Sequence, residues 1–110
     1  MNAVHTASEP LYSTLGGDPD LVEIVALFVD EMPARISAIA TLLADGNWDD
    51  LRRAAHQLKG SAGSYGFPAI SPLAAKVEDD VRNGQPEEAI RAAVDDLLGL
   101  CDRVRAGAPA

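Results

Sequence analysis

The chain has 110 residues, a formal net charge of −8 and a single cysteine. This length limits it to one small domain with a single core and leaves no room for a separate nucleotide-binding unit. The negative charge argues against nucleic acid as a partner, and no apolar run approaches the roughly 20 residues of a membrane span. With no export signal visible and no possible intramolecular disulfide, we expect a cytoplasmic protein that does not bind a membrane. No feature asks for a dimer, so a monomer is expected.

The N-terminal residues carry two predictions. Residues 1–7 are expected to be a disordered N-terminus, and a short extra helix is expected between Ser8 and Gly16. Serine suits the N-cap of a helix and Pro10 suits its first turn, while two consecutive glycines would end it.

A long amphipathic helix is predicted over residues 20–44, because apolar residues recur there at helical spacing over about seven turns. They are Leu21, Ile24, Val25, Phe28, Met32, Ile36, Ile39, Leu42 and Leu43. Pro33 lies within this stretch, and since the apolar phase continues past it, we predict one bent helix rather than two. Asp45 and Gly46 mark its end.

A second helix is predicted from Trp48 to about Ser64. Asn47 suits its N-cap, and acidic residues in its first turn are favourable to the helix dipole. Its core-facing stripe comprises Trp48, Leu51, Ala55, Leu58 and Ala62.

Two more helices are predicted after the turn that follows Ser64. The first begins at Pro68 or at Pro72, which Ser71 could cap, and it ends at Asn83; Pro86 opens the second. Their inward-facing residues are predicted to be Leu73, Val77 and Val81 in the first, and Ile90, Val94, Leu97, Leu98, Cys101 and Val104 in the second. The acidic pairs at 79–80, 87–88 and 95–96 are expected to be solvated.

Short connections make neighbouring helices antiparallel. We therefore predict an all-α fold, an antiparallel up-down-up-down four-helix bundle with the short extra N-terminal helix. The helical domain would span residues 8–106, and residues 107–110 would form a tail.

His56 lies on the surface of the second helix, roughly a third of a turn from the core-facing stripe. Its neighbours within one or two turns are Arg52, Arg53, Lys59, Gly60 and Gly63. Each glycine costs about 1 kcal/mol against alanine in a helix, so two of them so close together need a reason. They leave one flank of the imidazole open to another protein. An accessible imidazole among cations is what a phosphate-carrying histidine needs.

The stretch HQLKGSAGSYG, residues 56–66, resembles the signature of the histidine phosphotransfer (Hpt) domain family. The matching residues are His56, Leu58, Lys59, Gly60, Ser61, Ala62 and Gly66. Tyr65 is a mild departure, because the family usually has an aliphatic residue there. The resemblance extends from about Asp20 to Arg105 in the order and length of the helices.

The resemblance implies a role for each residue of the site. His56 would accept the phosphoryl group on Nε2, and Lys59 would pair with the phosphoryl oxygens. The family carries an acidic or amide residue 22 positions after the histidine, which orients the ring from the adjacent helix, and here this residue is Glu78. Arg82 matches a position where some members have a second cation. Glu78 could equally form only an i,i+4 pair with Arg82, worth a few tenths of a kcal/mol.

Partner docking is assigned to the residues around the phosphoacceptor. Gly60 and Gly63 would give a partner close access, while Gln57 would contact the partner or remain a solvated surface residue. Arg52 and Arg53 would add positive field and meet an acidic partner surface, or pair only with acidic residues one turn away.

The chain has no glycine-rich phosphate loop and no second histidine or cysteine near a metal-ligand spacing. It is therefore predicted to be a phosphocarrier of a two-component phosphorelay rather than an enzyme, with no metal or cofactor of its own. By the resemblance, its partners are receiver domains of response regulators and hybrid histidine kinases, which supply the aspartyl phosphate and Mg²⁺. His56 would take the phosphoryl group from a receiver aspartate, or from a histidine kinase, and pass it to a response-regulator aspartate.

Two alternatives belong to other functional classes. One is a non-phosphorylated helical adaptor that docks receiver or kinase domains, although an adaptor has no need of His56, Lys59 and Gly60 together. The other is an enzyme that uses His56 as a general base, which would require a concave site with convergent polar groups.

Overall fold

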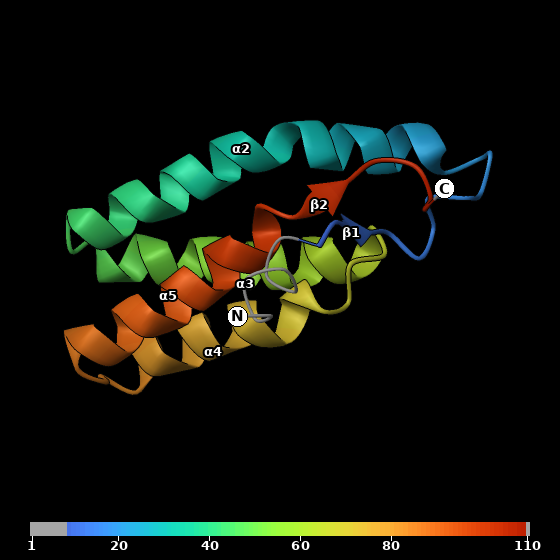
Figure 1. Cartoon of the computed structure of the whole chain (residues 1–110). Coiled ribbons are helices and arrows are strands. Elements are labelled where there is room, and N and C mark those ends of the chain that lie inside the picture. The colour runs from blue at the N-terminus through green and yellow to red at the C-terminus, as the bar shows by residue number, and fades with distance from the viewer. Residues whose placement is uncertain (1–8, 110) are drawn as a thin grey trace.

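The computed structural model describes residues 9–109, which form four packed helices and one pair of two-residue strands (Figure 1). In chain order the elements are β1 (Leu11–Tyr12), α2 (Val22–Ala44), α3 (Trp48–Ser64), α4 (Ile70–Arg82), α5 (Glu87–Cys101) and β2 (Val104–Arg105). Successive helices run in opposite directions along the bundle (Figure 1). The predicted all-α, up-down-up-down four-helix bundle is therefore confirmed. The predicted disorder of residues 1–7 and the predicted cap at Ser8 lie outside the described residues.

The prediction of a short extra helix before Gly16 is wrong. The chain instead forms β1, which pairs in parallel with β2, with Leu11 opposite Val104. The Leu11 amide donates to the carbonyl of Arg103 at 2.7 Å. This strand pair also ends the last helix at Cys101, so that Val104 is buried in a strand and not in the helix. A local capping preference is worth about 1 kcal/mol, and hydrogen bonds between the two ends of the chain override it.

α2 continues through Pro33 without interruption. Its buried residues are Val25, Phe28, Met32, Ile39 and Leu43. Ile24 was predicted to face the core, but it is 46% exposed, and Leu27 beside it is 59% exposed. Ile24 lies one residue before Val25 and thus about 100° away around the helix. The core covers a narrower face of α2 than the apolar pattern indicated.

α3 has the bounds that the sequence predicted. Leu51, Ala55, Leu58 and Ala62 are buried along one stripe, and Trp48 is half-buried at its start.

α4 begins at Ile70, between the two predicted starts. Ser71 does not cap it, because its hydroxyl donates to the carbonyl of Lys59 on α3 at 2.8 Å. The buried apolar residues of α4 are Ile70, Ala74 and Val77, whereas Leu73 and Val81 are only partly buried. Ala74 is fully buried, and α4 packs against both α3 and α5.

Asp80 is a second correction in α4, because it was expected to be solvated and is only 8% exposed. The Lys76 ammonium donates to its carboxylate at 3.1 Å. The turn into α5 folds back beside it, with the Gln85 amide donating to the Asp80 carbonyl at 3.0 Å. The ion pair and the turn together account for a buried acid that periodicity assigned to solvent.

Gly66 holds the turn between α3 and α4 against the N-terminal segment. Its φ of +84° is in the left-handed region that favours glycine. The Thr14 amide donates to its carbonyl at 2.8 Å, and the Ser13 hydroxyl donates to the carbonyl of Tyr65 at 2.6 Å. A Cβ on Gly66 would overlap the Ser13 hydroxyl. This glycine therefore serves the fold.

We predict that Gly66→Ala destabilises the protein more than Gly84→Ala. Both glycines have positive φ, which costs about 1–2 kcal/mol for alanine, but a Cβ on Gly84 would meet nothing within 4 Å. Gly66→Ala should cost about 1–3 kcal/mol more through overpacking against Ser13. Urea unfolding of the two variants measures the difference, and equal losses would show that the N-terminal segment moves aside at no cost.

Candidate functional site

His56 projects from the exposed face of α3, with 63% of its side chain accessible. Its Nδ1 lies 2.8 Å from Oε2 of Glu78, which comes from the antiparallel neighbour α4. An ionised carboxylate can only accept hydrogen bonds, so Nδ1 carries the ring hydrogen. Nε2 then bears the lone pair, on the side of the ring away from Glu78.

Glu78 is a buried carboxylate with three partners and is 2% exposed. Besides His56, the Lys59 ammonium donates to Oε1 at 2.9 Å and the Arg82 guanidinium donates to Oε2 at 2.8 Å. The Lys59 hydrogen bond lowers the pKa of Glu78 to about 2, against the opposing effect of burial, and His56 adds to the lowering. Glu78 thus contacts the imidazole and also forms the i,i+4 pair with Arg82. Both contacts that the sequence offered as alternatives are present.

Arg52 and Arg53 are held by the first turn of their own helix. Both guanidinium groups lie 3.2 Å from carboxylate oxygens of Asp49. Pairs as exposed as these contribute little to stability. The structure therefore shows both arginines paired with an acidic residue one turn away, which was one of the two hypotheses from the sequence. Their part in docking stays a prediction.

An open hollow of about 660 Å³ lies beside His56, between α2 and α3. It is lined by Arg35, His56, Gln57, Gly60, Ser61, Ser64 and Tyr65. The hollow is shallow and faces solvent. It differs from the enclosed, water-excluding pocket that an enzyme with a general base would require. It suits the approach of a group carried on another protein.

The two glycines near His56 have different surroundings. A Cβ on Gly60 would meet nothing within 4 Å, so the packing of the bundle does not require glycine there. A Cβ on Gly63 would lie 3.6 Å from the Ser71 hydroxyl on α4, which is ordinary contact. Both residues are exposed, but Gly60 lines the hollow while Gly63 lies along the seam between α3 and α4.

The sequence did not assign four of the residues that line this hollow to the site: Arg35, Ser61, Ser64 and Tyr65. The Arg35 guanidinium lies 5.4 Å above the ring of Phe28, and that ring stacks on Tyr65 with 5.0 Å between centroids. Arg35 is remote from the motif in sequence and reaches the hollow from α2. Met32 and Ile39, three residues before and four residues after Arg35, are buried, so helical periodicity places Arg35 beside the core but does not say which helix it faces.

Within residues 9–109, no three histidine, cysteine, aspartate or glutamate side chains come together as they would to hold a metal ion. No helix in the same part of the chain combines the length and the apolar character needed to cross a membrane.

The comparison with known families agrees with this geometry. The family model of the Hpt domain matches residues 23–107, from the start of α2 to just beyond β2. No curated protein and no solved structure matches the chain.

We predict that Glu78→Gln flattens the dependence of stability on acid pH. The pKa of Glu78 is about 2 in the folded protein and ordinarily 4.5, so its stabilising effect is complete above pH 4.5 and is lost as the pH falls toward 2. The wild type should lose a few kcal/mol of unfolding free energy over this range through this residue, and Glu78→Gln should not.

Urea unfolding at a series of pH values measures this effect. Asp79→Asn is the matched control, because Asp79 is the exposed neighbour on the same helix and its removal should leave most of the acid sensitivity. Parallel profiles for the wild type and Glu78→Gln would contradict the prediction.

Proposed function

This chain belongs to the Hpt domain family, whose members carry phosphoryl groups on a histidine in phosphorelays, and we propose that His56 is its phosphoacceptor. The observation that carries the proposal is the 2.8 Å contact between Nδ1 and Glu78. This contact fixes the hydrogen on Nδ1 and leaves the Nε2 lone pair as the nucleophile on an exposed ring.

The transfer follows from this geometry. The Nε2 lone pair of His56 attacks the phosphorus of an aspartyl phosphate, the new N–P bond forms, and the P–O bond to the aspartate breaks to release its carboxylate. No proton has to leave Nδ1, so the ring gains positive charge as the bond forms. The Glu78 carboxylate stabilises that charge, as a carboxylate does for the imidazolium of a catalytic triad. Onward transfer is the reverse of these steps, with a second aspartate.

The partner supplies what the site lacks. We propose receiver domains as both donor and acceptor, with the receiver holding the Mg²⁺ that neutralises the phosphoryl oxygens. Lys59 would exchange its contact with Glu78 for a contact with these oxygens. Gln57 and Gly60 line the hollow that the receiver would enter, and Arg52, Arg53 and Gly63 would lie around its edge. We place this exchange in the cytoplasm, which the lone buried thiol of Cys101 suits.

We predict that the wild-type chain takes up label from a phosphorylated receiver domain in the presence of Mg²⁺ and that His56→Gln does not. The label should be labile to acid and stable to base, as expected for a phosphoramidate linkage. Gel separation and autoradiography of the two chains measure it. No label on the wild type with any of several receivers would favour the adaptor, and label on both chains would move the chemistry away from His56.

We predict that Gly60→Ala separates stability from transfer. Alanine at this open helical position should raise the unfolding free energy by up to about 1 kcal/mol, and its methyl group should slow transfer from a receiver by narrowing the approach to His56. Gly99→Ala is the matched control, because Gly99 is a helical glycine of α5 whose Cβ would also meet nothing within 4 Å.

Gly99→Ala should gain similar stability and leave transfer unchanged. Stopped time courses with one receiver, together with urea unfolding, measure both quantities. Unaltered transfer by Gly60→Ala would show that close access at this glycine is not needed.

A further inference from the structure

Arg35 brings a cation to the hollow beside His56 from a different helix. It projects from α2, is 33% exposed, and lines the same hollow as His56 and Gly60. The other cations near the imidazole, among them Lys59, come from α3 and α4. Among residues 22–44, which form α2, Arg35 is the one cation, so it is the residue of that helix that could place positive charge beside a group bound on the ring.

The orientation of the imidazole turns Nε2 away from α4. Nδ1 is turned to Glu78 on α4, and Nε2 lies across Cε1 from it in the ring, so its lone pair points away from Glu78. α4 and α2 pack on different sides of α3 (Figure 1). The imidazole also lines the open hollow to which Arg35 contributes from α2.

Arg35 is also less neutralised than Lys59 and Arg82. Its nearest carboxylate oxygen, on Glu31, is 3.4 Å away and the pair is exposed, whereas Lys59 and Arg82 lie 2.9 Å and 2.8 Å from the buried Glu78. Within residues 9–109, the Nε of Arg35 is buried and has no hydrogen-bond partner. A buried donor without a partner is rare in a folded protein.

The aromatic stack beneath Arg35 holds the guanidinium in place. The guanidinium carbon lies over the Phe28 ring, which stacks on both Tyr65 and Phe67. This cation–π contact restrains the guanidinium beside the hollow, and its fork of donors matches two oxygens of a phosphoryl group.

We propose that Arg35 binds the phosphoryl oxygens while the group moves on to and off Nε2 of His56, on the side opposite Lys59. The proposal rests on His56 being the phosphoacceptor. Arg35 is then a phosphoryl-binding residue, and its contact is independent of which partner delivers the group.

The test uses a small phosphoryl donor, so that partner docking plays no part. Phosphoramidate transfers its phosphoryl group to an imidazole nitrogen: its own N–P bond breaks, ammonia leaves with that electron pair, and the new Nε2–P bond forms. The whole chain is compared with Arg35→Gln, Arg35→Met and Arg35→Lys, and ³¹P NMR follows the phosphohistidine. Circular dichroism confirms folding, and Arg35→Met keeps an apolar stem over Phe28 in case the glutamine variant unfolds.

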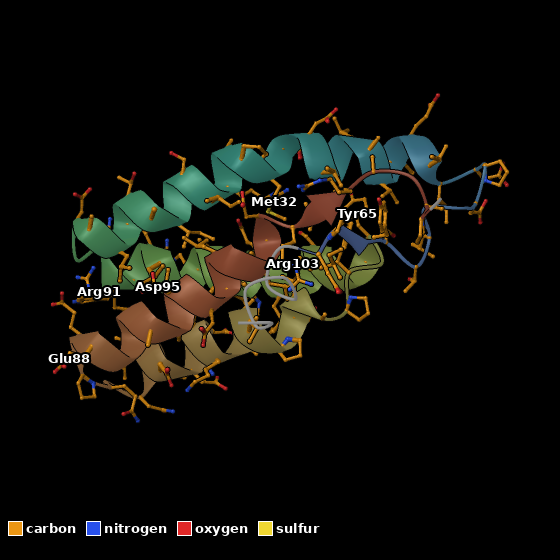
Figure 2. The ribbon with its side chains drawn as sticks, in the orientation of Figure 1. Met32, Tyr65, Glu88, Arg91, Asp95 and Arg103 are labelled. Atoms are coloured by element: carbon orange, nitrogen blue, oxygen red, sulfur yellow. The ribbon has the colours of Figure 1, made fainter. Side chains whose placement is uncertain are left out.

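Arg91→Gln is the matched control. Arg91 pairs with Glu87 at i,i+4, as Arg35 does with Glu31, and both pairs are exposed. Figure 2 shows Arg91 at the opposite end of the bundle from Tyr65, one of the residues that line the hollow. Loss of Arg91 should leave phosphorylation unchanged.

Arg35→Gln and Arg35→Met should lower the saturating rate by about tenfold to a hundredfold, as expected for a lost hydrogen bond to a charged group, with Arg35→Lys in between. An unchanged rate in either folded, uncharged variant overturns the proposal. Slowing with a phosphorylated receiver alone also overturns it, because Arg35 would then act in docking. A wild type that takes no phosphoryl group from either donor, or a His56→Gln chain that takes as much, overturns the proposed function and the Arg35 proposal with it.

Discussion

The site depends on one buried carboxylate. Removing an isolated carboxylate from water costs several kcal/mol unless partners restore its hydrogen bonds, and Glu78 regains them from His56, Lys59 and Arg82. Two of these partners lie on α3 and one lies on α4, so the same contacts join the helices and orient the imidazole. The imidazole is therefore exposed while its support is buried. This arrangement would let a partner reach Nε2 without disturbing the ring.

The motif of residues 56–66 contains glycines that are needed for two different physical reasons. Gly60 faces open space beside the hollow, and its missing side chain leaves room for another protein. Gly66 has a positive φ and touches Ser13, so its missing side chain serves the turn and the N-terminal segment. A sequence pattern alone shows both as glycines in a motif. The structure separates a glycine of the surface from a glycine of the fold.

The sequence predicted what depends on local periodicity and could not predict what depends on distant contacts. The bounds of α3 followed from an apolar stripe and a turn that lie within one stretch, although the predicted cap Asn47 makes no side-chain capping hydrogen bond and its side-chain amide donates to Asp50 instead. β1 could not be foreseen, because Leu11 pairs with Val104 at the other end of the chain. The burial of Asp80 depends on the turn into α5. Arg35 reaches the hollow only because α2 packs on α3 with one particular rotation, which periodicity leaves open.

Electrostatics sets a condition on any histidine that carries a phosphoryl group in this protein. The chain already has a net charge of −8, and a phosphoryl group adds roughly two more negative charges at neutral pH. Most cations near His56 are paired in the unphosphorylated protein, Lys59 with Glu78 and Arg53 with Asp49. The added charge must therefore draw Lys59 away from Glu78 or use a cation whose own ion pair is weak and exposed. Arg35 meets the second condition, because its ion pair with Glu31 is exposed and 3.4 Å long, and a phosphoryl group held there would leave the contact between Glu78 and the imidazole intact.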